Sequence, residues 1–120
     1  MKLVSIVIAV FLALPATAQD QQAAVGTGAI LRGLDKVSGE VTDMVLAAGE
    51  QAAMGRITVE MGQCRYPQGD PARDAYAFVT IREEGRDEPV FSGWMIASSP
   101  ALNALDHPRY DVWVLRCQTE

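Results

Sequence analysis

One stretch of the chain holds most of the side chains that could carry out chemistry. Residues 91–117 contain the single histidine, His107, with Asp106 before it, two adjacent serines, and both tryptophans. Serine, histidine and aspartate are the side chains of nucleophilic hydrolysis, and an imidazole beside a carboxylate can transfer protons. Either chemistry requires short distances, which the surrounding elements must set.

The local pattern predicts a short helix over residues 99–106. Ser99 is a favourable N-cap, Pro100 suits the first helical position, and Leu102 and Leu105 would share the buried face. This helix would also separate the serines from the histidine. Its rise would place the first serine and the imidazole about 12 Å apart, whereas a nucleophile and its base need about 3 Å. A serine hydrolase is therefore not expected.

The histidine has a structural interpretation. Pro108 ends the predicted helix and forces His107 out of helical geometry, so the imidazole would interact with the last helical carbonyls. The catalytic alternative pairs His107 with Asp106 or Asp111 as acid and base, but nothing in the sequence fixes their separation. We assign no catalytic residue, and an enzyme is not expected.

No metal site or cofactor is expected either. A single histidine cannot complete a common zinc set with two cysteines. The acidic cluster at 83–88 lacks the calcium-loop spacing and indicates a solvated hairpin tip.

The elements that must position these residues are short strands. Apolar runs occupy residues 29–37, 40–48, 56–64, 75–84, 89–97 and 110–118, and turns or a loop at 65–74 separate them. This spacing predicts an all-β fold, either a small antiparallel sandwich or a partly open barrel. The runs at 75–84 and 110–118 are apolar on both faces, so we expect them to be covered central strands. We also expect core packing for Trp94 and Trp113.

The two cysteines, Cys64 and Cys117, predict a structural disulfide, because an even count in an exported chain indicates one. Closing a loop of about 54 residues would stabilise the fold by roughly 4 kcal/mol. Strict alternation would place Cys64 on the polar face of its strand. Gly62 predicts a bulge that returns it to the core.

The N-terminus has the pattern of a secretory signal peptide over residues 1–18. Lys2 precedes an uncharged apolar run that is too short to span a membrane, and Ala16-Thr17-Ala18 is a cleavage signal. A flexible segment, 19–28, and a single β domain, 29–118, would follow. The expected location is the periplasm, with no stable membrane anchor in the mature chain.

The charge balance excludes classes of partner. Without residues 1–18 the chain has nine basic residues against fifteen acidic ones, a net charge of −6, and no basic run. Nucleic acids and anionic membrane surfaces are bound through clustered Lys and Arg, so neither is expected as a partner.

The segments "AILRGLDKVSGEVTD" and "FSGWMIASSPALNALDHPRYDVWVLRC" resemble the DUF2155 family, a group of uncharacterised exported alphaproteobacterial proteins. The resemblance covers about residues 29–117. It implies export and one small domain, and it brings no catalytic residue, cofactor or substrate.

Together these patterns predict a non-catalytic interaction or accessory module that binds an unknown envelope protein or complex. Six residues are candidates for binding: Arg32, Asp35, Lys36, His107 and Tyr110 for the protein partner, and Trp94 for a glycan. The alternative is a binder of glycans or cell-wall fragments that uses exposed tryptophans.

Overall fold

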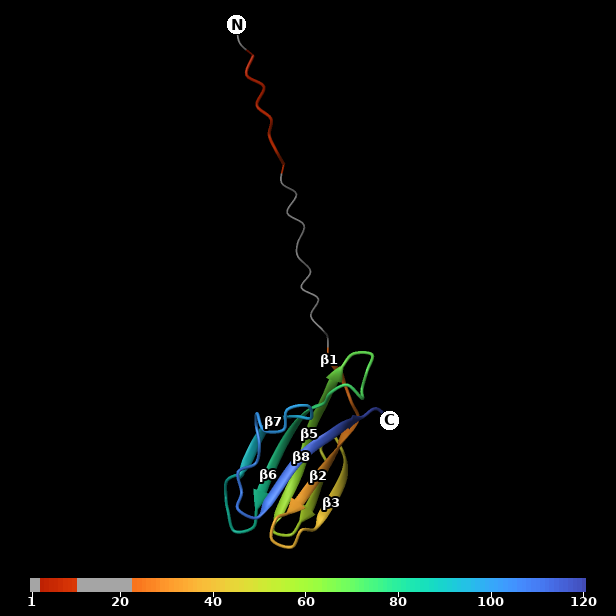
Figure 1. The fold of residues 1–120 in the computed structure, drawn as a ribbon, viewed down its shortest axis with the longest axis vertical. Coiled ribbons are helices and arrows are strands. Elements are labelled where there is room, and N and C mark those ends of the chain that lie inside the picture. The colour runs from red at the N-terminus through yellow and green to blue at the C-terminus, as the bar shows by residue number, and fades with distance from the viewer. Residues whose placement is uncertain (1–2, 11–22) are drawn as a thin grey trace.

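The computed structural model describes residues 3–10 and 23–120, and the domain that it describes is built from strands (Figure 1). The strands are β1 (Ala23–Val25), β2 (Gly28–Asp35), β3 (Val41–Ala47), β4 (Gln51–Met54), β5 (Ile57–Pro67), β6 (Tyr76–Glu83), β7 (Phe91–Ile96) and β8 (Tyr110–Gln118). All pairings are antiparallel. The five-stranded sheet has the order β1–β5–β6–β7, with β4 also on β5, and the three-stranded sheet has the order β3–β2–β8.

The two sheets face each other as a sandwich and do not close into a barrel, which confirms the all-β prediction (Figure 1). Period-two alternation directs one face of each strand into a shared apolar core. The core receives Leu31, Met44, Leu46, Val59, Met61, Val79, Ile81, Val112 and Val114, all at most 5% exposed. The other face of each strand points outward.

Two register shifts bring the cysteines together. Between Met61 and Gln63 the pairing of β5 with β6 shifts, which confirms the bulge predicted at Gly62 and leaves Cys64 fully buried. A second shift, in the pairing of β2 with β8, leaves Leu115 without a partner and turns Cys117 inward. The predicted disulfide is present, with a Cα–Cα distance of 5.6 Å, and it joins the two sheets.

The prediction of a helix at 99–106 was wrong, because this segment of the described chain is a loop of turns. The loop crosses from β7 to β8, and only Leu105 is buried, while Leu102 is 75% exposed. The Asn103 side chain donates to the carbonyl of Trp94, 2.9 Å away. An isolated two-turn helix is marginal, so these anchors to the sandwich decide the conformation.

Two expectations about strand position and packing also need correction. The run at 75–84 does form a central strand, β6, but β8 lies at an edge of its sheet and pairs only with β2 among the described strands. Neither tryptophan is in the core: Trp94 is 38% exposed and Trp113 is half-buried. Strict alternation grouped Trp113 with Cys117, and the extra residue Leu115 breaks that alternation.

The N-terminal predictions fall partly outside the described residues. Residues 3–10 contain no helix or strand, whereas 1–2 and 11–18, the rest of the predicted signal peptide, are not described. Residues 23–28 of the predicted flexible segment 19–28 are described. They contain β1, which pairs with the C-terminal end of β5, and the first residue of β2. No helix within the described residues is long and apolar enough to cross a membrane.

Candidate functional site

Four of the six candidate residues meet at one end of the sandwich, where they hold the β2–β3 turn against the segment before β8. The carboxylate of Asp35 accepts hydrogen bonds from the Arg109 guanidinium, with 3.1 Å to Nη2, and from the backbone N–H groups of Val37 and Ser38. The bond from Arg109, aided by these backbone donors, lowers the pKa of Asp35 to about 2. Lys36 donates to the carbonyl of His107 at 2.6 Å.

His107 uses both ring nitrogens inside the fold. Its Nδ1 accepts the backbone N–H groups of Arg109 and Tyr110, at 3.0 and 3.1 Å. The proton therefore lies on Nε2, which donates to a carboxylate oxygen of Glu83 at 3.1 Å. The side chain is only 9% exposed. This geometry fits a residue that fixes a loop.

The cavity beside His107 offers little chemistry. It measures about 350 Å³, and Glu83, Arg86, Asp106 and His107 are its polar lining residues. None of the described residues that line it is a serine, threonine or cysteine, so no nucleophile faces the imidazole. Asp106, proposed in the catalytic alternative, lines the same cavity, but the hydrogen-bond partner of His107 is Glu83.

Tyr110 is also structural in its contacts. It is 1% exposed, and its hydroxyl accepts the backbone N–H of Arg56 at 3.0 Å. Together with Asp35, Lys36 and His107, it closes one end of the sandwich. Across residues 3–10 and 23–120, no three His, Cys, Asp or Glu side chains are grouped closely enough to hold a metal ion.

Arg32, the fifth candidate, lies on the outer face of the three-stranded sheet. We use "the outer face of β3–β2–β8" for the outward residues of these strands: Ile30, Arg32, Leu34, Val41, Asp43, Val45, Asp111, Trp113 and Arg116. Pairing sets them in rows, with Asp43, Arg32 and Trp113 in the central row. Val41 and Val45 are 56% and 58% exposed, so apolar side chains flank that row in solvent.

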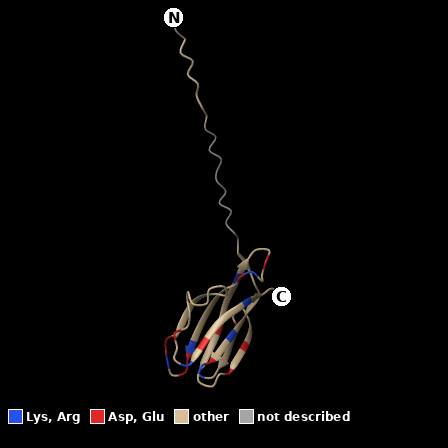
Figure 2. Ribbon diagram, viewed as in Figure 1, with Lys and Arg blue, Asp and Glu red and all other residues tan. Residues whose placement is uncertain are grey.

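The central row contains a two-pronged ion pair. Arg32 donates from Nε and Nη2 to the two carboxylate oxygens of Asp43, at 2.7 and 3.1 Å. The hydrogen bond from Arg32 lowers the pKa of Asp43. Asp111 forms no such pair with any described cation. Figure 2 shows that acidic and basic residues are interspersed along the strands.

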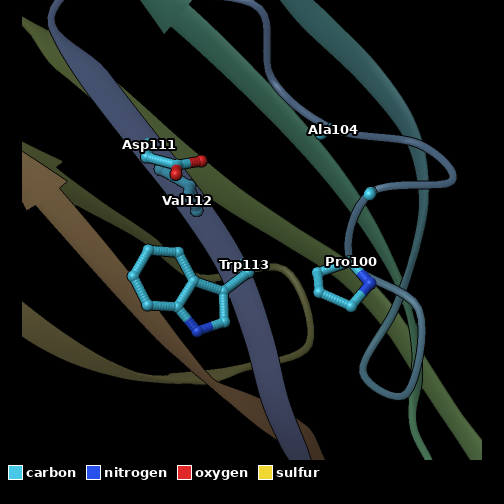
Figure 3. A pocket seen from close by; sticks show the side chains of 6 residues that line it. Pro100, Ala104, Asp111, Val112 and Trp113 are labelled. Carbon is cyan, nitrogen blue, oxygen red and sulfur yellow. The ribbon is translucent and has the colours of Figure 1, made fainter.

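A groove adjoins this face along β8. It measures about 400 Å³ and lies between Asp111, Val112 and Trp113 of β8 and Pro100, Ala101 and Ala104 of the loop. Most of its lining is apolar. Figure 3 shows the indole of Trp113 and the carboxylate of Asp111 on β8, with Pro100 and Ala104 on the neighbouring loop. Groove and outer face therefore share Asp111 and Trp113.

Trp94, the sixth candidate, lies on the opposite side of the molecule, on the outer face of the five-stranded sheet. Its ring packs edge-on against Phe78, with centroids 5.4 Å apart, and the Arg65 guanidinium lies 5.4 Å from its centroid. The structure thus does not bring Trp94 near Arg32 or the cluster around Asp35.

The sequence analysis did not place Val41, Val45 or Asp111 on a binding surface, and it expected Trp113 in the core. One signal was available: in "VTDMVLA" an alternation that buries Met44 and Leu46 turns Val45 outward, and Val41 lies on the same outward face. The exposure of Trp113 had no such signal, because it depends on the register shift at Leu115.

Comparison with known proteins identifies the family. Residues 29–117 match the family described as "Uncharacterized protein conserved in bacteria (DUF2155)". An uncharacterized protein of Rickettsia prowazekii (strain Madrid E) is 31% identical over 87 residues, which cover 70% of this chain and 56% of that protein. The chain thus spans little more than half the length of this relative. No solved structure matches the chain. The match over most of the chain shows that this protein belongs to the DUF2155 family.

Proposed function

We propose that this protein is an exported, non-catalytic interaction module of the bacterial envelope, and that it docks a protein partner on the outer face of β3–β2–β8. The observation that carries the proposal is the exposure of Val41 and Val45, above one half each, beside the Arg32–Asp43 ion pair. Solvent-exposed apolar side chains that flank an ion pair on a rigid sheet are typical of a protein-binding surface.

The proposed compartment has two supports. The disulfide between Cys64 and Cys117 is consistent with an oxidising environment such as the periplasm. The pattern of residues 1–18 is that of a secretory signal. The non-catalytic part of the proposal is supported by His107, whose two ring nitrogens are engaged in holding the 106–110 segment.

In-cell crosslinking of the tagged full chain in its host, followed by mass spectrometry, tests the proposal. We expect one dominant envelope protein, and we expect Val41→Lys with Val45→Lys to abolish its capture, because two charges would be desolvated in the interface. The matched control is Gln51→Lys with Ala53→Lys, which adds the same charge to exposed positions on β4. Capture that survives the β3 variant, or is lost equally in the control, would contradict this surface.

Trp94 supports a second candidate function, the binding of glycans or cell-wall fragments. At 38% exposure, beside Phe78 and the Arg65 guanidinium, its indole offers solvent-facing aromatic surface. Fluorescence titration with soluble cell-wall fragments tests this function. Glycan binding predicts a saturable change that Trp94→Phe removes and Trp113→Phe retains, and a flat titration would leave the protein-docking proposal as the better account.

A further inference from the structure

We propose that the open edge of β8 receives an extended segment of the protein partner as an added antiparallel strand, whose central side chain enters the groove beside Val112. This inference rests on the proposed function and names the part of the partner that the protein would hold. Its basis is the combination of a free strand edge, an apolar groove along that edge and a carboxylate that lacks a cation.

Within the described residues, the outer edge of β8 has no backbone hydrogen-bond partner over most of its length, and the groove separates it from the 100–104 loop. Among the described strands β8 pairs only with β2, and no backbone hydrogen bond outside the sheets involves residues 111–117. Natural edges are commonly blocked by lysine, proline, bulges or a covering loop. Residues 110–118 contain no lysine or proline, and the bulge at Leu115 leaves 110–114 regular. The edge of β7 differs from that of β8, because its Trp94 carbonyl accepts a hydrogen bond from the Asn103 side chain.

The side chains of β8 specify the added segment. Asp111 and Trp113 point to the outer face, while Val112, 2% exposed, points inward beside the groove. Directly opposed residues on paired strands have Cβ atoms about 5 Å apart and interact. An antiparallel segment would therefore place an apolar residue opposite Trp113, an aliphatic one opposite Val112 in the groove, and a basic one opposite Asp111, in that order from its N-terminus.

The charges around Asp111 favour a basic residue at the opposite position of the added strand. The neighbouring carboxylates already have partners, Asp43 with Arg32 and Asp35 with Arg109, whereas Asp111 has no ion pair within the described part of the chain. A lysine or arginine on the added strand would supply one. The excess of acidic residues in the chain would also favour the approach of a basic segment.

The groove has a suitable size for one side chain of a strand. Its volume, about 400 Å³, is at the lower end for small-molecule sites, and its loop wall consists of Pro100, Ala101 and Ala104. These side chains are short, so the wall leaves room beside the strand edge. Leu105 is buried and Asn103 is hydrogen-bonded to β7, and these two residues hold the wall in place.

Titration of the ¹⁵N-labelled protein, purified from its host, with the peptide Ac-Ser-Thr-Leu-Val-Lys-Thr-Ser-NH₂ tests the inference. We expect saturable amide shifts and slowed hydrogen exchange at residues 111–114. A peptide with N-methyl groups on its Leu and Val keeps the side chains and loses the strand donors, so it should not bind. Replacing the peptide lysine by glutamate should weaken binding about tenfold, because a favourable cross-strand charge pair becomes repulsive.

A charge exchange provides the matched control. Asp111→Lys should reverse the preference, so that the glutamate peptide binds the variant more tightly than the lysine peptide does. Unchanged binding of the N-methylated peptide, protection at β3 instead of β8, or no protection at about 1 mM peptide would overturn strand addition. If these failures occur while the Val41 and Val45 variant still abolishes partner capture, the proposed docking function stands and only strand addition is wrong.

Discussion

The hydroxyl of Tyr110 accepts a hydrogen bond from the backbone N–H of Arg56 at 3.0 Å, and this bond ties the start of β8 to the turn between β4 and β5 in the other sheet. The turn fits closely around the ring. Gly55, in this turn, has a φ of 56°, and a β-carbon there would collide with the phenol. Tyr110 and Gly55 therefore set how the strand that carries Asp111 and Trp113 is seated on the sandwich.

A pair of glycine substitutions measures this fit. Gly39 also has a positive φ, 79°, but a β-carbon there would meet no heavy atom within 4 Å. Gly39→Ala should lower the free energy of unfolding by about 1 kcal/mol through backbone strain alone. Gly55→Ala should cost a further ~1–3 kcal/mol, because the added methyl group overpacks against Tyr110. Urea unfolding of both variants checks the difference, and equal losses would show that the Tyr110 contact has no energetic weight.

The disulfide should dominate the stability of so small a domain. Cys64 and Cys117 are 53 positions apart, and opening the crosslink should lower the free energy of unfolding by about 4 kcal/mol through the entropy of the unfolded chain. Denaturant unfolding with and without reductant measures this loss. The Cys64→Ala, Cys117→Ala variant is the control, because its unfolding curve should not respond to reductant. An unchanged curve for the reduced wild-type protein would contradict the prediction.

The ion pair between Asp35 and Arg109 should give the protein an acid-sensitive stability. The pKa of Asp35 is about 2 in the folded protein, lower than its value of 3.8 in the unfolded chain. Its stabilising contribution is therefore complete above about pH 4 and is lost as the pH falls through about 2.

Asp35→Asn should remove this part of the pH dependence. Arg109→Gln should reduce it, because the main donor that lowers the pKa of Asp35 is gone. The measurement is the free energy of unfolding as a function of pH for the wild type and both variants. Parallel curves for all three proteins in the acid range would refute a role for this pair.

His107 should behave as a structural residue in mutagenesis. His107→Ala removes the acceptor of two backbone N–H groups and the partner of Glu83, so the free energy of unfolding should fall by about 2 kcal/mol. His107→Asn offers an acceptor near the position of Nδ1 and should lose less. Thermal or urea unfolding separates the two variants, and partner capture by the folded Asn variant should equal that of the wild type. A stable alanine variant that no longer captures the partner would indicate a direct functional role instead.

The sequence predicted the elements that depend on local pattern. The runs around β2, β3, β5, β6, β7 and β8 were visible as apolar segments between turns, and Gly62 indicated the bulge that buries Cys64. The cysteine count indicated the disulfide. These features follow from side-chain period, turn chemistry and redox context, which a single chain shows directly.

The predictions that failed concern features that depend on contacts between distant segments. Ser99 and Pro100 favour a helix start, but the loop is held by Asn103 on β7 and by Leu105 in the core. Trp113 does not share a face with Cys117, as strict alternation predicted, because Leu115 is an extra residue in the pairing with β2. The candidate residues also lie in three separate places: a structural cluster around Asp35, the outer face that carries Arg32, and the outer face that carries Trp94. Contacts between distant segments set this division, and spacing along the chain could not show it.

Site-specific photocrosslinking at Val45 tests the central claim most directly, because Val45 is 58% exposed on the proposed docking face and touches neither the core nor the groove wall. A photoreactive amino acid is placed at Val45 or, as the control, at Gln51, exposed on β4 of the other sheet, in the full chain within its host. We predict a crosslink to one envelope protein from Val45 and none from Gln51. Equal yields from both positions, or capture only from Gln51, would contradict the assignment of the outer face of β3–β2–β8 as the docking surface.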